Sequence, residues 1–185
     1  MISTLIASFV LNSAVPMICP VAGDEIHDGA QHYVFNGLMT AICCAGCEVP
    51  LKADPAKVLS KKRDALVAYS LFDPVSQLRV TEKKSKAFAD YNGVRYFFES
   101  EENKATFGKS AAKLTVFPAK EVAGKCAVRG EKIAMEDAVA FRDVNNIRYY
   151  FCCAGCVSKF DKEPATYTSK LQPAKAVLLK AKAIE

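Results

Sequence analysis

The chain of 185 residues is 51% hydrophobic and carries 25 basic and 20 acidic side chains, a composition typical of folded globular proteins. That composition excludes an intrinsically disordered chain, and a net charge of +5 is too small to indicate a nucleic-acid partner. No apolar run reaches the roughly 20 residues that a membrane-spanning helix needs, so we expect no transmembrane segment.

Residues 1–16 differ from the rest of the chain. An apolar stretch over residues 4–11 precedes the small residues Ser13 and Ala14, an order typical of a short export signal. The basic residues that usually open such a signal are missing, so a disordered N-terminus, a buried tail or a first strand is an equal alternative. The sequence therefore leaves an exported and a cytoplasmic location open.

Three segments of the chain align with one another, and we call them copies one, two and three. They span residues 17–60, 70–115 and 124–168. In each copy an extended run leads to a two-residue turn of the kind that tolerates positive φ in a tight hairpin. These turns are Asn36-Gly37, Asn92-Gly93 and Asn145-Asn146. A second strand and a short helix follow, so the sequence predicts three tandem hairpin-plus-helix units of the α+β class.

The segments between and after the copies are shorter. Residues 61–69 and 117–124 are expected to be linkers. The last segment, residues 173–185, contains a short apolar run from Ala176 to Leu179 and predicts a C-terminal helix.

Eight cysteines fall in two clusters, four in copy one and four in copy three. In each cluster one cysteine precedes the hairpin, and three form Cys-Cys-Ala-Gly-Cys at the junction of strand and helix. A cysteine at a strand end and another four residues later point at one spot, and the hairpin returns the distant cysteine to it. The helix N-terminus also favours thiolate, the ligating form. The predicted metal ligands are Cys19, Cys43 and Cys47 in copy one and Cys126, Cys152 and Cys156 in copy three.

Four more side chains are candidates for an additional ligand. Cys44 and Cys153 adjoin the predicted ligands, but neighbouring side chains diverge, so each becomes a ligand only in an irregular turn and otherwise belongs to the core. His27 and His32 both lie in copy one, where either would complete a site of three cysteines and one histidine. The alternative is that both are exposed loop residues.

Copy two has no cysteine. The residues aligned with the four cysteines are Asp73, Glu99, Ser100 and Asn103, whereas the aromatic residues Tyr96, Phe98 and Phe107 remain. Packing residues are kept where ligands are replaced, so copy two is predicted to be a structural spacer. A weak site for a hard ion at Asp73 and Glu99 is the minor alternative.

At these residues the sequence resembles the YHS family and the related TRASH family of small treble-clef-like metal-binding units. The similarity covers all three copies. It rests on the openings Cys19-Pro20-Val21 and Asp73-Pro74-Val75, the Asn-Gly turns, and the series Tyr149, Tyr150, Phe151, Cys152, Cys156, Phe160, Pro164 and Tyr167. The resemblance implies units that bind heavy or transition metals in metal-handling proteins, and it does not imply catalysis. Copy one departs from the pattern at Thr40-Ala41-Ile42 and at Leu51, and copy two lacks the ligands.

We therefore expect a protein without enzymatic activity that binds about two soft metal ions per chain. Zinc and copper suit thiolate ligands best. The expected role is that of a metal carrier, buffer or sensor, with a metal-handling protein as its partner. One alternative is an interaction scaffold held by structural zinc. Another is an exported thiol or disulfide protein, because each cluster contains a C-x-x-C pattern. A nucleic-acid-binding zinc module is disfavoured because the basic residues are dispersed.

Overall fold

The computed structural model of the chain describes residues 16–61 and 63–183. The expected export signal falls on residues 1–16, of which residues 1–15 lie outside the described residues. The described residues form ten strands in two sheets and five short α-helices. The predicted α+β class is confirmed.

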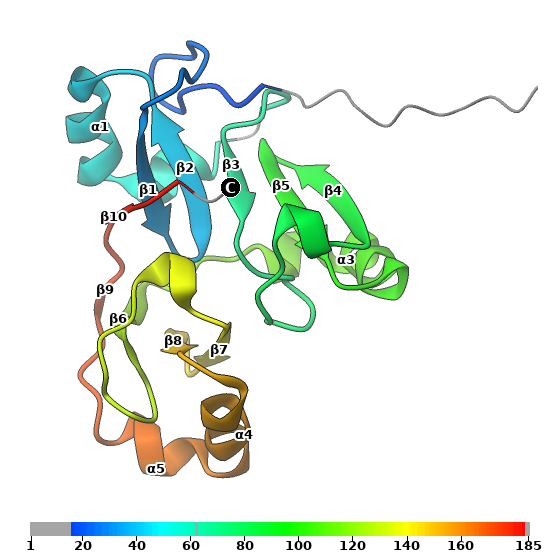
Figure 1. The fold of residues 1–185 in the computed structure, drawn as a ribbon, viewed down its shortest axis with the longest axis vertical. Coiled ribbons are helices and arrows are strands. Elements are labelled where there is room, and N and C mark those ends of the chain that lie inside the picture. The colour runs from blue at the N-terminus through cyan, green and yellow to red at the C-terminus, as the bar shows by residue number, and fades with distance from the viewer. Residues whose placement is uncertain (1–15, 62, 184–185) are drawn as a thin grey trace, which may run out of the picture.

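Each copy contains one hairpin followed by a helix (Figure 1). The strands are β1 (Gln31–Phe35) with β2 (Leu38–Ile42), β4 (Ala87–Tyr91) with β5 (Val94–Phe98), and β7 (Ala140–Val144) with β8 (Ile147–Phe151). The helices after these hairpins are α1 (Glu48–Ala53), α3 (Glu101–Leu114) and α4 (Ala154–Lys162). The shorter helices α2 (Pro55–Leu59) and α5 (Pro164–Thr168) follow α1 and α4.

The hairpin turns are built as the sequence predicts. Asn36, Asn92 and Asn145 have φ angles of 50°, 52° and 53°, and the residue after each also lies at positive φ. Two successive residues at positive φ give a turn whose twist matches that of the flanking strands. The turn residues therefore help to fix the register of each hairpin.

The segments expected to be linkers contain strands, which corrects that expectation. β3 (Ala68–Ser70) pairs with β2 and runs parallel to β5. β6 (Lys120–Cys126) runs parallel to β8. Parallel partners are necessarily far apart along the chain, so the local residue pattern of a short strand gives little sign of this pairing.

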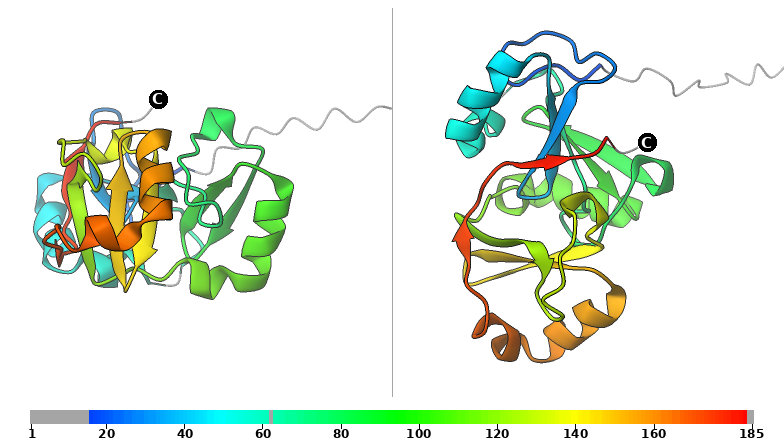
Figure 2. Two further views of the ribbon diagram at one scale, coloured as in Figure 1. Left: turned by 90° about the horizontal axis from the view of Figure 1, so that it is seen from below. Right: turned by 60° about the vertical axis from the view of Figure 1, so that its left-hand side comes forward.

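The predicted C-terminal helix over residues 173–185 is wrong. Its described part forms β9 (Ala174–Lys175), which pairs with β6, and β10 (Leu179–Ala181), which pairs with β1. The edges of β1 and β6 offer backbone hydrogen bonds, and this pairing outweighs the helix preference of a short apolar run. The segment runs alongside both sheets and connects copy three with copy one (Figure 2).

Copies one and two share one sheet, and copy three has its own. The first sheet has the order β10-β1-β2-β3-β5-β4 and the second the order β7-β8-β6-β9. In copy two the aromatic side chains of β5 pack on the helix, with ring centres of Tyr96 and Phe98 lying 4.9 and 5.2 Å from that of Phe107. The aligned rings of copy three pack in the same way. The aromatic residues kept between these copies therefore form their cores.

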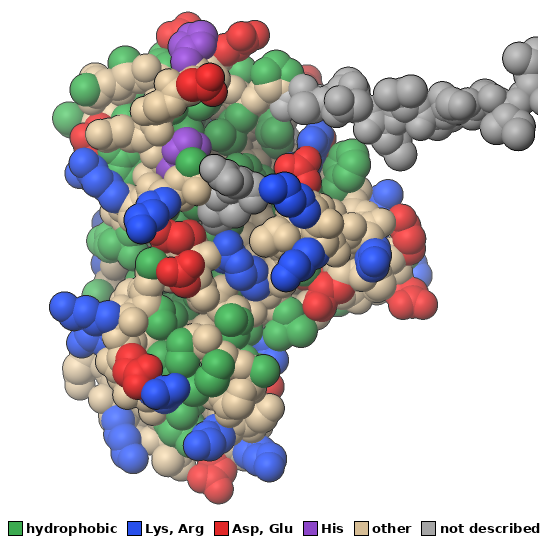
Figure 3. Space-filling view, in the orientation of Figure 1, with side chains coloured by type: hydrophobic (Ala, Val, Ile, Leu, Met, Phe, Trp, Pro, Cys, Tyr) green, Lys and Arg blue, Asp and Glu red, His purple; other side chains and the backbone are tan. Residues whose placement is uncertain are grey.

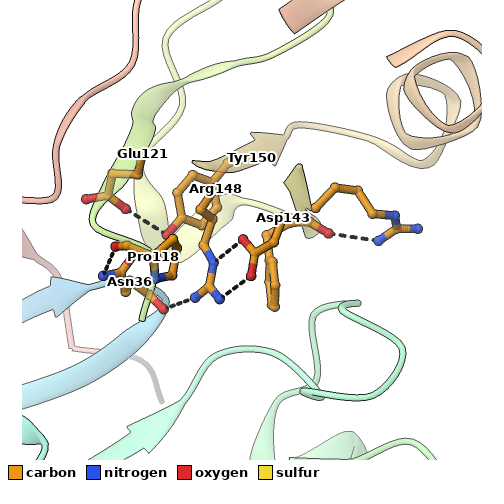
Figure 4. Close-up of polar contacts among 8 residues, drawn as sticks. Asn36, Pro118, Glu121, Asp143, Arg148 and Tyr150 are labelled. Atoms are coloured by element: carbon orange, nitrogen blue, oxygen red, sulfur yellow. Dashed lines mark hydrogen bonds and ion pairs between the residues drawn. The ribbon is translucent and has the colours of Figure 1, made fainter. Parts of the chain in front are cut away.

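Arg148 of copy three, which forms an ion pair with Asp143 of the same copy, also contacts copy one (Figure 4). Arg148 on β8 donates to the carboxylate of Asp143 on β7 from Nε at 2.9 Å and from Nη2 at 2.7 Å. Its Nη1 donates to the backbone oxygen of Asn36 in the β1–β2 turn. Burial alone would lower the pKa of Arg148, but the hydrogen bonds to Asp143 and the charges of neighbouring acidic groups together outweigh it and hold that pKa raised. All three side-chain nitrogens of Arg148 thus donate hydrogen bonds, and one of these bonds joins the two copies.

Candidate metal centres

The first cysteine of each cluster begins a tight loop that precedes the hairpin, and Cys126 is also the last residue of β6. The N–H of Cys19 donates to the oxygen of Asp24 at 2.7 Å, and the N–H of Gly23 donates to the oxygen of Cys19 at 2.9 Å. Gly23 has a φ of 85°, a conformation that glycine adopts without a Cβ clash. Cys126 makes the two equivalent backbone bonds, each of 2.8 Å. The loop therefore presents the first sulfur in the same way in both copies.

The second and third cysteines come from the junction of strand and helix. Cys43 directly follows β2, and Cys47 ends a single 3₁₀ turn that leads into α1. Cys152 directly follows β8, and Cys156 lies in the first turn of α4. The hairpin folds these residues back over the loop that carries the first cysteine.

The three predicted ligands converge in each copy. The sulfur atoms of Cys19, Cys43 and Cys47 all lie within 4.8 Å of one another, and so do those of Cys126, Cys152 and Cys156. The sulfurs of Cys43 and Cys47 are 3.9 Å apart, and those of Cys152 and Cys156 are 3.8 Å apart. Sulfurs bound at about 2.3 Å to a tetrahedral ion lie about 3.8 Å apart. Both groups therefore have the spacing that one thiolate-bound ion requires.

The pKa values of the three thiols of copy one are shifted in different directions. Burial raises the pKa of Cys47 to about 11 and also raises the pKa of Cys43. Burial acts in the same direction on Cys19, but backbone N–H donors, including that of Ala22 at 3.5 Å, outweigh it and lower its pKa. A binding ion must therefore displace protons from Cys43 and Cys47, so metal affinity should fall as the pH falls.

Cys44 and Cys153 do not belong to the groups of mutually close sulfurs. Their sulfurs lie 3.4 Å from those of Cys47 and Cys156, respectively. Both residues have extended backbone and occupy the position just before the first helical residue. Ser100 holds this position in copy two, where its hydroxyl accepts from the N–H of Asn103.

The two histidines also lie outside the groups of mutually close ligand atoms in the described residues. His27 is exposed, and Nδ1 of His32 lies 3.0 Å from the backbone oxygen of Ala30. The two are separate on the face seen in Figure 3. On the same face, basic and acidic side chains are interspersed over the described residues, without a continuous basic surface.

Sequence reasoning missed one acidic group beside the first cluster. Oδ2 of Asp24 lies 3.7 Å from the sulfur of Cys43. The aligned Glu131 of copy three is instead paired with Arg129, 2.6 Å away. An acidic residue five positions after the first cysteine of both copies was the signal available in the sequence. The two clusters therefore share their sulfur geometry but differ in the charged groups around it.

Copy two fills the same junction with hydrogen bonds. Asp73 is fully buried, and its Oδ2 accepts from the N–H of Glu99 at 3.0 Å and from Nδ2 of Asn103 at 2.7 Å. Its Oδ1 accepts from the N–H of Val75 at 2.8 Å. Asp73, Glu99 and Asn103 align with the three predicted ligands of copy three. One carboxylate thus joins the loop, the strand end and the helix where the other copies place three sulfurs.

Comparison with known proteins gives no relative from which a role can be transferred. No family model, curated protein or solved structure matches the chain. Among the described residues, no helix has both the length and the apolar character needed to cross a bilayer. The geometry of the two cysteine groups is therefore the main guide to function.

Proposed function

We propose that the chain binds two soft transition-metal ions, one at each cysteine cluster, and serves as a non-enzymatic metal carrier, buffer or sensor. Zinc and copper are the ions that best suit sites made of thiolates. We also propose that its copies are treble-clef-like units related to the YHS and TRASH families. The partner in this role is a protein that delivers or receives the ion.

The observation that carries this proposal is the repeated convergence of three sulfurs. Two groups that are 107 residues apart at their first cysteine, Cys19 and Cys126, have the same spacing and the same pattern of burial. Copy two keeps the surrounding elements but replaces the sulfurs with the hydrogen bonds of Asp73. Sulfur is therefore not needed to form this junction, which favours a role for the cysteines beyond packing.

The partial exposure of the cysteine that follows each strand favours exchange of the bound ion with a chelator or a partner protein. Cys43 and Cys152 are half-buried, whereas the other two predicted ligands of each cluster are buried. Solvent thus reaches one side of each sulfur group. A chelator or a partner's thiol can approach from that side, as transfer of an ion requires.

The alternative of structural zinc is favoured by one observation. The Asp73 network shows that the loop, strand end and helix of a copy are tied together even without sulfur. A metal ion at the same place in copies one and three would tie the same three segments. In that case the ion stabilises a scaffold and does not exchange readily.

A chelator challenge separates these roles. We expect zinc or copper(I), loaded without oxygen, to pass to an excess of chelator within minutes while the circular-dichroism signal of the strands is kept. The two sheets and the hydrogen bond from Arg148 to Asn36 hold the fold when the ions leave. Slow exchange accompanied by unfolding would instead support the structural role.

A further inference from the structure

The proposed metal sites leave one cysteine of each cluster without a role. Cys44 and Cys153 stand outside the groups of three sulfurs, yet each lies 3.4 Å from the sulfur of one predicted ligand. The partner is Cys47 in copy one and Cys156 in copy three. The same distance occurs in both clusters, so it is a repeated feature and not an accident of one loop.

The position of these residues makes them accessible to a reagent. Cys44 is exposed and Cys153 is half-buried, whereas Cys47 and Cys156 are buried. Each accessible cysteine is three residues before its buried partner, at the start of a helical turn. A disulfide needs its two sulfurs about 2.05 Å apart, so each pair must close by roughly 1.4 Å from its present distance.

We propose that Cys44–Cys47 and Cys153–Cys156 are thiol–disulfide switches that release the bound metal ion when they are oxidised. This inference rests on the proposed function, because release requires that Cys47 and Cys156 hold an ion. The oxidant is a low-molecular-weight disulfide such as oxidised glutathione. Oxidation removes one of the three sulfurs from each site.

The reaction balances as thiol–disulfide exchange. The Cys44 sulfur attacks one sulfur of the small disulfide, forms a mixed disulfide and expels one small thiolate. The Cys47 sulfur then gives up its bond to the metal and attacks the Cys44 sulfur, which expels the second thiolate. The two cysteines lose two electrons, the small disulfide gains them, and the expelled thiolates take up protons, including the one from Cys44. The ion is left with two sulfurs and dissociates. Cys153 and Cys156 react in the same way.

The structure supplies a matched variant for the test. Ser100 occupies the aligned position in copy two and caps its helix, so Cys44→Ser and Cys153→Ser should keep the local fold. We would load the chain with zinc, add oxidised glutathione, and follow zinc release with a colorimetric chelator too weak to remove zinc from the reduced chain. The disulfides would be mapped by alkylation and mass spectrometry.

We expect the wild-type chain to release two ions, each single variant to release only one promptly, and the double variant to release zinc at least roughly tenfold more slowly. The mapped disulfides should be Cys44–Cys47 and Cys153–Cys156. Unchanged release from the double variant, or disulfides that involve Cys19 or Cys43 instead, would overturn the switch. So would a double variant that no longer binds zinc, because Cys44 and Cys153 would then be ligands.

If the proposed metal binding itself is wrong, these experiments would give a different result. A wild-type chain that binds no metal would refute the metal sites, and no release could then be observed. Disulfide mapping on that chain would still show whether the two pairs form. The release assay and the mapping therefore separate the two ideas.

Discussion

Arg148→Met is expected to lower the free energy of unfolding by about 3 kcal/mol, because it removes a buried guanidinium that donates to the Asp143 carboxylate and to the buried backbone oxygen of Asn36. The side chain of Arg148 is only 7% exposed, and that of Asp143 is 31% exposed. The substitution leaves the Asp143 carboxylate and the Asn36 oxygen without their donors. For a chain of this size the loss corresponds to a fall in melting temperature of about 6–12 °C.

The matched control is Arg95→Met in copy two. Arg95 aligns with Arg148 and binds Asp90 through the same two donor atoms, at 2.8 and 2.9 Å. The Asp90 side chain is 45% exposed, so this pair should contribute less than about 1 kcal/mol. Urea unfolding of both variants in the same metal-loaded state checks the difference. Equal losses would show that the contact between copies one and three is not a special source of stability.

Changing Asp73, Glu99 and Asn103 together to cysteine should give copy two a metal site of its own. These residues already meet through the two hydrogen bonds to Oδ2 of Asp73. They also align with the three predicted ligands of copy three. We therefore expect the number of bound zinc ions to rise from two to three per chain. Without zinc the variant should be less stable, because the buried bonds of Asp73 are lost.

The control for this gain replaces the same three residues with serine. That variant also loses the Asp73 network but has no thiolates. We expect zinc to stabilise the cysteine variant by about 4 kcal/mol more than the serine variant when free zinc is 1,000 times the dissociation constant of the new site. Unfolding measured with and without zinc checks this value. A folded cysteine variant that still binds two ions would argue that the geometry of the junction does not by itself make a site.

Much of the site could be predicted because the residues that define it form short local patterns that recur in more than one copy. The Asn-Gly and Asn-Asn pairs mark the hairpin turns, and Asn36, Asn92 and Asn145 adopt the predicted positive φ. A hairpin between the first and second cysteines then forces the sulfurs together. Comparison of the copies also separates core residues kept in copies two and three, such as Phe107 and Phe160, from the predicted ligands, which copy two replaces.

The features that sequence reasoning missed depend on distant partners. β3 and β6 are short, and their pairing is decided by strands that come later in the chain. Nothing in the apolar run from Ala176 to Leu179 itself indicates that its end will pair with the open edge of β1. Arg148 has the same local pattern as Arg95, but Arg148 also donates to the backbone oxygen of Asn36 in copy one. Tertiary contacts, not local preference, decide these cases.

The presence of two thiolate metal sites is tested most directly by elemental analysis of the chain purified without oxygen and reconstituted with zinc or copper(I). Cys47→Ser and Cys156→Ser each remove one buried member of a sulfur group. We predict two ions per wild-type chain, one in each single variant and none in the double variant. A wild-type chain that takes up neither metal, or single variants that keep both ions, would contradict the assignment of these clusters as metal sites.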